Sequence, residues 1–166
     1  MSEIRNKISE SGLITLDMKS FKGSQKRIVI DIKNWLFNGM VLKEKIFREH
    51  LKNENWSQYE NTFVALNCSA DTIVPIWSYM LITKYLKPHA KCVIFGNKKS
   101  LEKKIFEVNI DNLDLAELKN KRVLLKGCTD IYIPDESYVQ ISNKLMGTVK
   151  SLMFGEACSN VPIFKA

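Results

Sequence analysis

Three short apolar runs, each followed within a few residues by a cysteine, constrain the fold of this chain more than any other feature. After each run come the cysteine, a hydroxyl residue, an Asp or Asn, and a β-branched residue followed by proline; these corner segments are 68–75, 128–134 and 158–162. An apolar run of this length that stops at small, polar and proline residues is typical of a buried strand leaving its sheet. Cys68, Cys128 and Cys158 are therefore predicted to follow three strands.

Strand and helix patterns alternate through the second part of the chain. The predicted strands are 62–67, 91–96, 122–127, 149–155 and 161–165, and the predicted helices are 76–86, 98–108 and 134–146. Strands that alternate with helices favour an α/β fold in which helices cover a mostly parallel sheet.

The first part of the chain adds further strands. A short edge strand is predicted at 11–17, and the alternation of Ile28, Ile30 and Ile32 predicts a half-buried strand at 27–33. Asn38-Gly39 between two apolar triplets is a strong hairpin signal, which adds antiparallel strands. We therefore expect a mixed, mostly parallel sheet of about five to six strands flanked by helices.

The first corner segment leads into a helix. Pro75 suits the first turn of the helix at 76–86, and Asp71 or Thr72 is expected to cap it. This helix is apolar on nearly all sides, so we expect it to be buried on more than one side.

Length and composition are those of an ordinary globular protein. The chain has 166 residues, 45% apolar and 26% charged, which favours a single α/β domain over 1–166. Within it we distinguish an N-terminal extension with an edge strand (1–26) from the main body (27–166). No apolar run approaches the ~20 residues that cross a bilayer, and no secretory signal is visible. We expect a cytoplasmic protein whose cysteines remain thiols or bind metal.

The net charge of +7 raises the question of a nucleic-acid partner. The lysines occur in scattered pairs among acidic residues, and no basic strand carries the aromatic residues that stack on bases. The charge is better explained as a solvated lysine-rich surface, and nucleic acid is disfavoured. The sequence names no partner and leaves a homo-oligomer open.

The corner segments are expected to converge at one site. Ligands of open parallel sheets bind at the carboxyl ends of the strands. If the three strands are neighbours, three thiols meet at that edge of the sheet, whereas Cys92 lies near the start of its strand and belongs to the opposite edge. Three carboxylates follow the same strands and are expected close by: Asp71, Asp130 and Glu156.

The first interpretation of this site is a zinc centre of unknown function. Cys68, Cys128 and Cys158 would hold Zn²⁺ as thiolates, with Asp71, Asp130, Glu156, a histidine or water as the fourth ligand. The spacing argues against it, because the chain has no Cys-x-x-Cys pair. An iron–sulfur cluster is less favoured.

Two further interpretations remain open, and the sequence does not decide whether the protein is an enzyme. A cysteine activated at a helix N-terminus could perform redox or sulfur-transfer chemistry. The histidines for such chemistry are His50, on an apolar helix stripe, and His89, expected at the wrong edge of the sheet. Alternatively the protein is a non-catalytic adaptor whose cysteines only pack, since cysteine is a small buried residue.

Several stretches resemble a bacterial family known as a domain of unknown function, number 2480 of that series. The stretches are 11–17, 31–36, 55–59, 68–71 with Pro75 and Trp77, 126–128, 153–156, 158–159 and 161–163. They extend over nearly the whole chain. The family signature includes the three corner cysteines, so the resemblance implies a site there, but it implies no activity. Ala157 stands where the family has proline.

Overall fold

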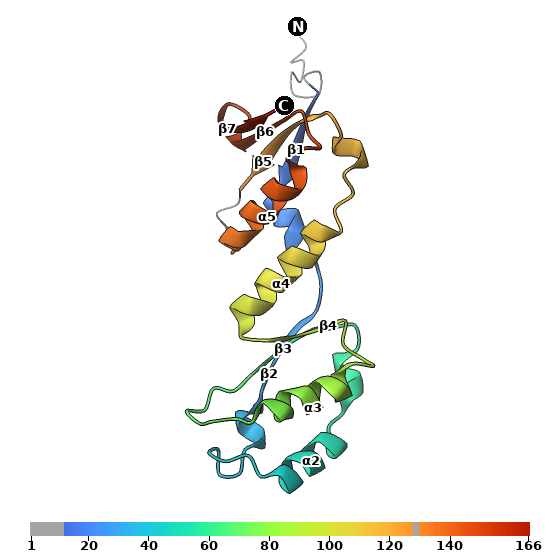
Figure 1. Cartoon of the computed structure of the whole chain (residues 1–166), viewed down its shortest axis with the longest axis vertical. Helices are drawn as coiled ribbons and strands as arrows, with labels where there is room; N and C mark the ends of the chain where they lie inside the picture. Colours follow the sequence, from blue (N-terminus) through green and yellow to red (C-terminus); the bar gives the residue numbers. More distant parts are fainter. Residues whose placement is uncertain (1–11, 128–129) are drawn as a thin grey trace, which may run out of the picture. The chain divides into compact units, whose positions relative to one another are not determined.

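The computed structural model describes residues 12–127 and 130–166, which form two compact units (Figure 1). Unit 2 is the continuous segment Ser24–Lys104. Unit 1 combines the described residues up to Gly23 with Ile105–Ala166. The helix α4 (Lys98–Asp111) begins in unit 2 and ends in unit 1.

Unit 2 is built on a three-stranded parallel sheet in the order β2-β3-β4. Its elements are β2 (Arg27–Asp31), η2 (Ile32–Trp35), α2 (Glu44–Asn53), η3 (Trp56–Tyr59), β3 (Phe63–Asn67), α3 (Ile76–Leu86) and β4 (Cys92–Phe95). One hydrophobic core joins α2 and α3 to the same face of the sheet, since Phe47, Ile82 and Val64 belong to it and are fully buried.

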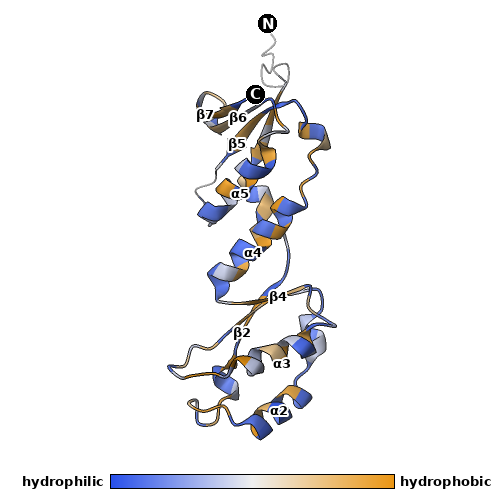
Figure 2. Cartoon of the chain, viewed as in Figure 1, coloured by the Kyte–Doolittle hydropathy of each residue, from blue (hydrophilic) through white to orange (hydrophobic). Residues whose placement is uncertain are grey.

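Unit 1 contains a four-stranded sheet in the order β1-β5-β6-β7. Besides the second half of α4, its elements are β1 (Leu13–Asp17), η1 (Met18–Lys22), η4 (Ala116–Leu118), β5 (Arg122–Lys126), α5 (Asp135–Leu145), β6 (Ser151–Glu156) and β7 (Ser159–Lys165). β1, β5 and β6 are parallel, and β7 is antiparallel to β6. α4 and α5 show alternating hydrophilic and hydrophobic bands (Figure 2), as amphipathic helices on a sheet should.

The two units repeat the same fold. From the start of α2 to Gly96, each residue has its counterpart 59 positions later in the chain, so that 47 corresponds to 106 and 96 to 155. The identical stretches include 45–47 with 104–106, 78–79 with 137–138, and 95–96 with 154–155. β1 and η1 of unit 1 correspond to β2 and η2 of unit 2. Unit 2 is therefore inserted into unit 1 between η1 and α4.

Equivalent hydrogen bonds support this correspondence. The N–H of Asn61 donates to the carbonyl of His89 at 3.0 Å, and its counterpart Asn120 donates to the carbonyl of Thr148 at 2.9 Å. Asn61 and Asn120 both have positive φ, 54° and 58°.

Equivalent aromatic contacts support it as well. Tyr79 and Phe95 form an edge-to-face pair with ring centroids 5.0 Å apart, and Tyr138 and Phe154 form the same pair at 5.6 Å.

The α/β class and the mostly parallel strand pairing predicted from the sequence are confirmed, but the strands are divided between two sheets. β1, within the stretch 11–17 where an edge strand is expected, is an edge strand. At Asn38 and Gly39, φ is 51° and 68°, yet the turn is flanked only by an isolated bridge between Phe37 and Val41. The antiparallel pair is instead β6 with β7.

The start of α3 also differs from the prediction. Pro75 is its N-terminal cap residue, and no side chain caps the helix. Thr72, one of the two expected caps, donates its hydroxyl to the carbonyl of Met40 at 2.6 Å. The hydroxyl of Ser78 instead donates to the carbonyl of Pro75 at 2.7 Å. No helix within the described ranges has the length and hydropathy of a membrane span.

Candidate functional site

The carboxyl edge of the unit 2 sheet is organised by Asp31 at the end of β2. Its carboxylate accepts the N–H of Lys33 at 3.0 Å, which caps η2. It also accepts the N–H of Ser69 at 3.1 Å and the Ser69 hydroxyl at 2.5 Å. Asp31 thereby ties the end of β2 to the segment that follows β3 and begins with Cys68, which is half-buried against the core.

These contacts shift the ionisation of two groups. Partial burial alone would raise the pKa of Asp31, but the hydrogen bonds from Ser69 and Lys33, with the charge of Lys33, lower the pKa below its ordinary value. The pKa of Tyr79 is raised by partial burial and then by the charges that Cys68 and Asp31 carry when ionised. Asp31, Cys68 and Tyr79 therefore interact at this edge of the sheet.

The lowered pKa of Asp31 predicts a loss of stability in acid. A carboxylate whose folded-state pKa lies below its unfolded value stabilises the fold above the unfolded pKa, and this stabilisation is lost as the pH falls through the folded pKa. Ser69→Ala removes the hydroxyl donor, so the folded pKa should rise and the loss should begin at higher pH. NMR titration of the Asp31 carboxyl carbon measures the folded-state pKa in the unchanged protein and in the variant. An unchanged pKa in the variant would contradict the assigned role of Ser69.

The carboxyl edge of the unit 1 sheet holds two ion pairs. Lys126 at the end of β5 pairs with Glu156 at the end of β6, at 3.1 Å. Lys19 of η1 pairs with Asp130 at 2.8 Å. Both expected carboxylate ligands of this unit thus contact lysine ammonium groups.

One premise of the predicted convergence, that the three cysteines follow neighbouring strands of one sheet, is not met. Cys68 follows β3 of the unit 2 sheet, whereas β5 and β6 belong to the unit 1 sheet, so the three strands are not neighbours. Cys158 follows β6, as predicted, and lies exposed in the turn Ala157-Cys158 between the antiparallel strands β6 and β7. Cys128 lies outside the described residues. Cys92 begins β4, as expected.

The repeat also changes which residue corresponds to Cys68. Strand pairing matches Asn67 with Lys126, because they oppose Asp31 and Asp17 in the two sheets. The counterpart of Cys68 is therefore Gly127. A Cβ at Gly127 would lie 3.3 Å from the Tyr138 hydroxyl, just as Cys68 lies near Tyr79.

The zinc site gains no support from the geometry. Within residues 12–127 and 130–166, no three His, Cys, Asp or Glu side chains are grouped as metal ligands would be. Asp71, the third expected carboxylate, lies in the loop between β3 and α3 of unit 2, whereas Asp130 and Glu156 belong to unit 1.

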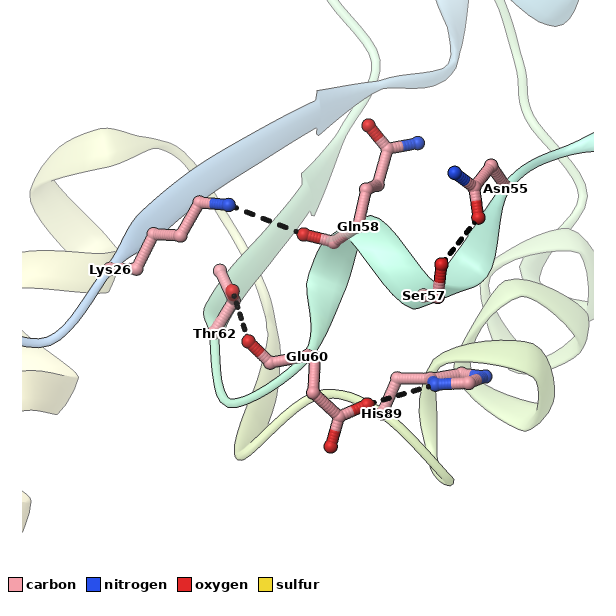
Figure 3. A network of polar contacts seen from close by, with 7 residues as sticks. All are labelled: Lys26, Asn55, Ser57, Gln58, Glu60, Thr62 and His89. Atoms are coloured by element: carbon pink, nitrogen blue, oxygen red, sulfur yellow. Dashed lines mark hydrogen bonds and ion pairs between the residues drawn. The ribbon is translucent and has the colours of Figure 1, made fainter.

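His89 lies at the edge of the sheet where β3 and β4 start, as predicted. Its Nδ1 is 3.1 Å from a carboxylate oxygen of Glu60 (Figure 3). Around it, the Thr62 hydroxyl donates to the carbonyl of Glu60 at 3.1 Å, and the Lys26 ammonium donates to the carbonyl of Gln58 at 3.3 Å (Figure 3). This network fixes the amino edge of the sheet, opposite the edge where Cys68 follows β3.

A second feature of unit 2 is an exposed apolar groove, which the sequence did not predict. The expectation that α3 is buried on more than one side is wrong, because Ile76 and Met80 are 71% and 67% exposed. Phe95 at the end of β4 is 71% exposed. Together with Tyr79 and Thr83 these residues line a hollow of about 510 Å³, which we call the α3–β4 groove.

The equivalent helix of unit 1 shows that this apolar surface is not a requirement of the fold. Ile76 and Trp77 correspond to Asp135 and Glu136, which lie in the first turn of α5. Acidic residues favour a helix N-terminus, and α5 accordingly begins with the hydrophilic colour in Figure 2. α3 has no acidic residue in its first turn.

Comparison with known proteins identifies a family and no activity. No curated protein and no solved structure matches the chain. A family model described as "Protein of unknown function (DUF2480)" matches residues 2–166. Because the match covers nearly the whole length, the chain belongs to this family.

Proposed function

We propose that the protein is a binding module that holds an apolar segment of a partner protein in the α3–β4 groove. The observation that carries this proposal is the exposure of Ile76 and Met80 on α3. The same helix of the repeat, α5, has Asp135 in place of Ile76. Of the interpretations open from the sequence, this one corresponds to the adaptor.

The surroundings of the groove are those of a protein interface. Met80 also lines a neighbouring hollow of about 380 Å³, which is bordered by Glu44, Arg48 and Lys84. An apolar centre with a charged rim is the usual composition of an interface. Contiguous exposed apolar surface in a folded protein commonly marks such a site.

The conformation of the groove is fixed by packing beneath it. Tyr79 is held by the edge of Phe95, with 89° between their rings. Trp77, which lines the neighbouring hollow together with Met80, packs edge-on to the buried Phe47, with centroids 6.0 Å apart. A groove that is formed before binding loses little entropy when a partner binds.

Placing a charged side chain in the groove tests the proposal. Heptapeptides are selected from a random displayed library on the immobilised protein, and their affinities are measured for two variants. Met80→Lys is expected to weaken the selected peptides at least about tenfold, because it places an ammonium in the apolar groove. Val139→Lys is the matched control, since Val139 is the counterpart of Met80 on α5 and is 69% exposed. Peptides that bind both variants as tightly as the unchanged protein would refute the proposal.

A zinc ion held by Cys68, Cys128 and Cys158 stays a prediction of the sequence. Elemental analysis of untagged protein is expected to find about one zinc per chain if the prediction holds, since a three-thiolate site binds zinc tightly. Serine at each of these positions should release the metal, whereas Cys92→Ser should retain it. Protein free of metal after purification in zinc-supplemented buffer would contradict the prediction.

A further inference from the structure

We propose that the apolar segment binds as an extended strand, antiparallel to β4, and places a β-branched residue in the α3–β4 groove. This inference rests on the proposed function and adds how the segment binds and what chemistry it has. The partner is a stretch of another protein with the features of this chain's own strand β7.

The repeat supplies the template for the missing strand. In unit 1, β6 is covered by β7, which pairs antiparallel with it: Phe154 opposes Val161 and Leu152 opposes Phe164. In unit 2, β4 is the counterpart of β6. The chain turns from β4 directly into α4, and no described strand pairs with the outer side of β4.

The backbone of β4 presents the same groups that β7 engages on β6. The N–H groups of Cys92 and Gly96 point to β3, since they contact the carbonyls of Thr62 and Leu66 at 3.5 and 2.9 Å. Backbone groups alternate in direction along a parallel strand, so Val93 and Phe95 point outward. Their counterparts are Leu152 and Phe154, which oppose Phe164 and Val161 of β7.

The side-chain space beside β4 also matches. In unit 1 a hollow of about 190 Å³ is lined by Tyr138, Ser142 and Phe154, with Ile163 of β7 on its border. In unit 2 the counterparts Tyr79, Thr83 and Phe95 line the much larger groove of about 510 Å³, and no described strand other than β4 contributes a residue to its lining.

The exposure of the aromatic ring at the strand end agrees with this difference. Phe154 beside β7 is 39% exposed, whereas Phe95 is 71% exposed. A strand placed on β4 as β7 is placed on β6 would bring its equivalent of Ile163 against Tyr79 and Phe95.

Strand addition combines two sources of binding free energy. Main-chain hydrogen bonds to the sheet edge give affinity for any extended segment, and pockets for alternate side chains select among segments. The groove selects for a β-branched residue, because Ile163 occupies this position in the repeat. Met80 and Ile76 widen the apolar contact beyond that available in unit 1.

A peptide with the sequence of β7 is the probe. The blocked peptide Ser159–Lys165 is titrated into the full chain, whose own β7 remains on β6 because its covalent link gives it a far higher effective concentration. Binding is expected to slow amide hydrogen exchange at Val93 and Phe95. N-methylation of the peptide at Val161 and Phe164 should weaken binding at least about tenfold, as expected from the loss of two hydrogen bonds. N-methylation at Asn160 is the matched control and should have little effect.

The outcomes separate this inference from the proposed function. One outcome is that the library peptides lose affinity for Met80→Lys, yet keep their affinity when N-methylated and leave amide hydrogen exchange at Val93 and Phe95 unchanged. In that case strand addition is wrong, but the groove still binds peptides. Failure of the β7 peptide to bind likewise overturns strand addition. If Met80→Lys has no effect on any peptide, both proposals fail. If sedimentation shows a dimer that Met80→Lys dissociates, a second copy of the chain is the occupant and a partner segment is excluded.

Discussion

Replacing Phe47 with alanine is expected to lower the free energy of unfolding by about 3–5 kcal/mol. The Phe47 side chain is fully buried in the core of unit 2. Its ring packs edge-on to Trp35 and Trp77, each with centroids 6.0 Å away. The substitution removes both aromatic contacts and leaves a cavity in a core that can only partly collapse around it.

Tryptophan fluorescence during denaturant unfolding reports the loss of stability in unit 2, the unit that contains Phe47. The three tryptophans of the chain are Trp35, Trp56 and Trp77, and all lie in unit 2. Val139→Ala serves as the control and should change stability by no more than about 0.5 kcal/mol, because the side chain is exposed. A loss below about 1 kcal/mol for Phe47→Ala would contradict the packing described for α2.

Gly155→Ala should lower stability by at least about 2 kcal/mol, the second largest effect that we expect. Gly155 lies in β6 with φ 129°, a backbone conformation that residues with a Cβ rarely adopt. An added Cβ would lie 2.7 Å from the carbonyl oxygen of Ser159 and 3.1 Å from the Cα of Asn160. Both neighbours are backbone atoms of β7, so relief requires β7 to move away from β6.

Gly147→Ala separates the clash from the backbone strain. Gly147 also has a positive φ, 87°, but nothing lies within 4 Å of its added Cβ. Its substitution should cost about 1–2 kcal/mol from conformational strain alone. Chemical denaturation followed by circular dichroism compares the variants. Equal losses at Gly147 and Gly155 would mean that β6 and β7 accommodate the methyl group.

The sequence predicted the individual elements well because the signals for them are local. The helix at 76–86 has the bounds of α3, and hydrophobic runs located the strands to within a few residues. The division into two sheets was missed because strand partners are not local: β1 pairs with β5, about a hundred residues away. An apolar run shows that a strand is buried, not which strand lies beside it.

The repeat was missed because matching by cysteine gave the wrong register. Cys68 and Cys128 differ by one position from the alignment that strand pairing imposes, and the repeat has few identical residues. The sequence Asp-x-Lys, which occurs at the end of the first strand of each unit, is a better signal for the repeat. Asp17 and Asp31 both accept the N–H of the residue two positions later, at 2.9 and 3.0 Å.

The groove was missed for a different physical reason. A helix that is apolar on nearly all sides is normally buried on several sides, so the helix at 76–86 is expected from its sequence to leave no apolar face exposed. α5 has the same buried face as α3 but carries acidic residues in its first turn. Only this comparison shows that the fold requires the buried face and does not require the exposed apolar residues of α3.

The insertion of unit 2 between η1 and α4 also fixes an order of events during synthesis on the ribosome. All strands of unit 2 have been made once α4 begins, whereas β1 has to wait for β5. At ordinary elongation rates that interval is about 5–20 s. Unit 2 is therefore expected to complete its sheet first, while β1 emerges early and remains without its sheet neighbour until β5 has been made.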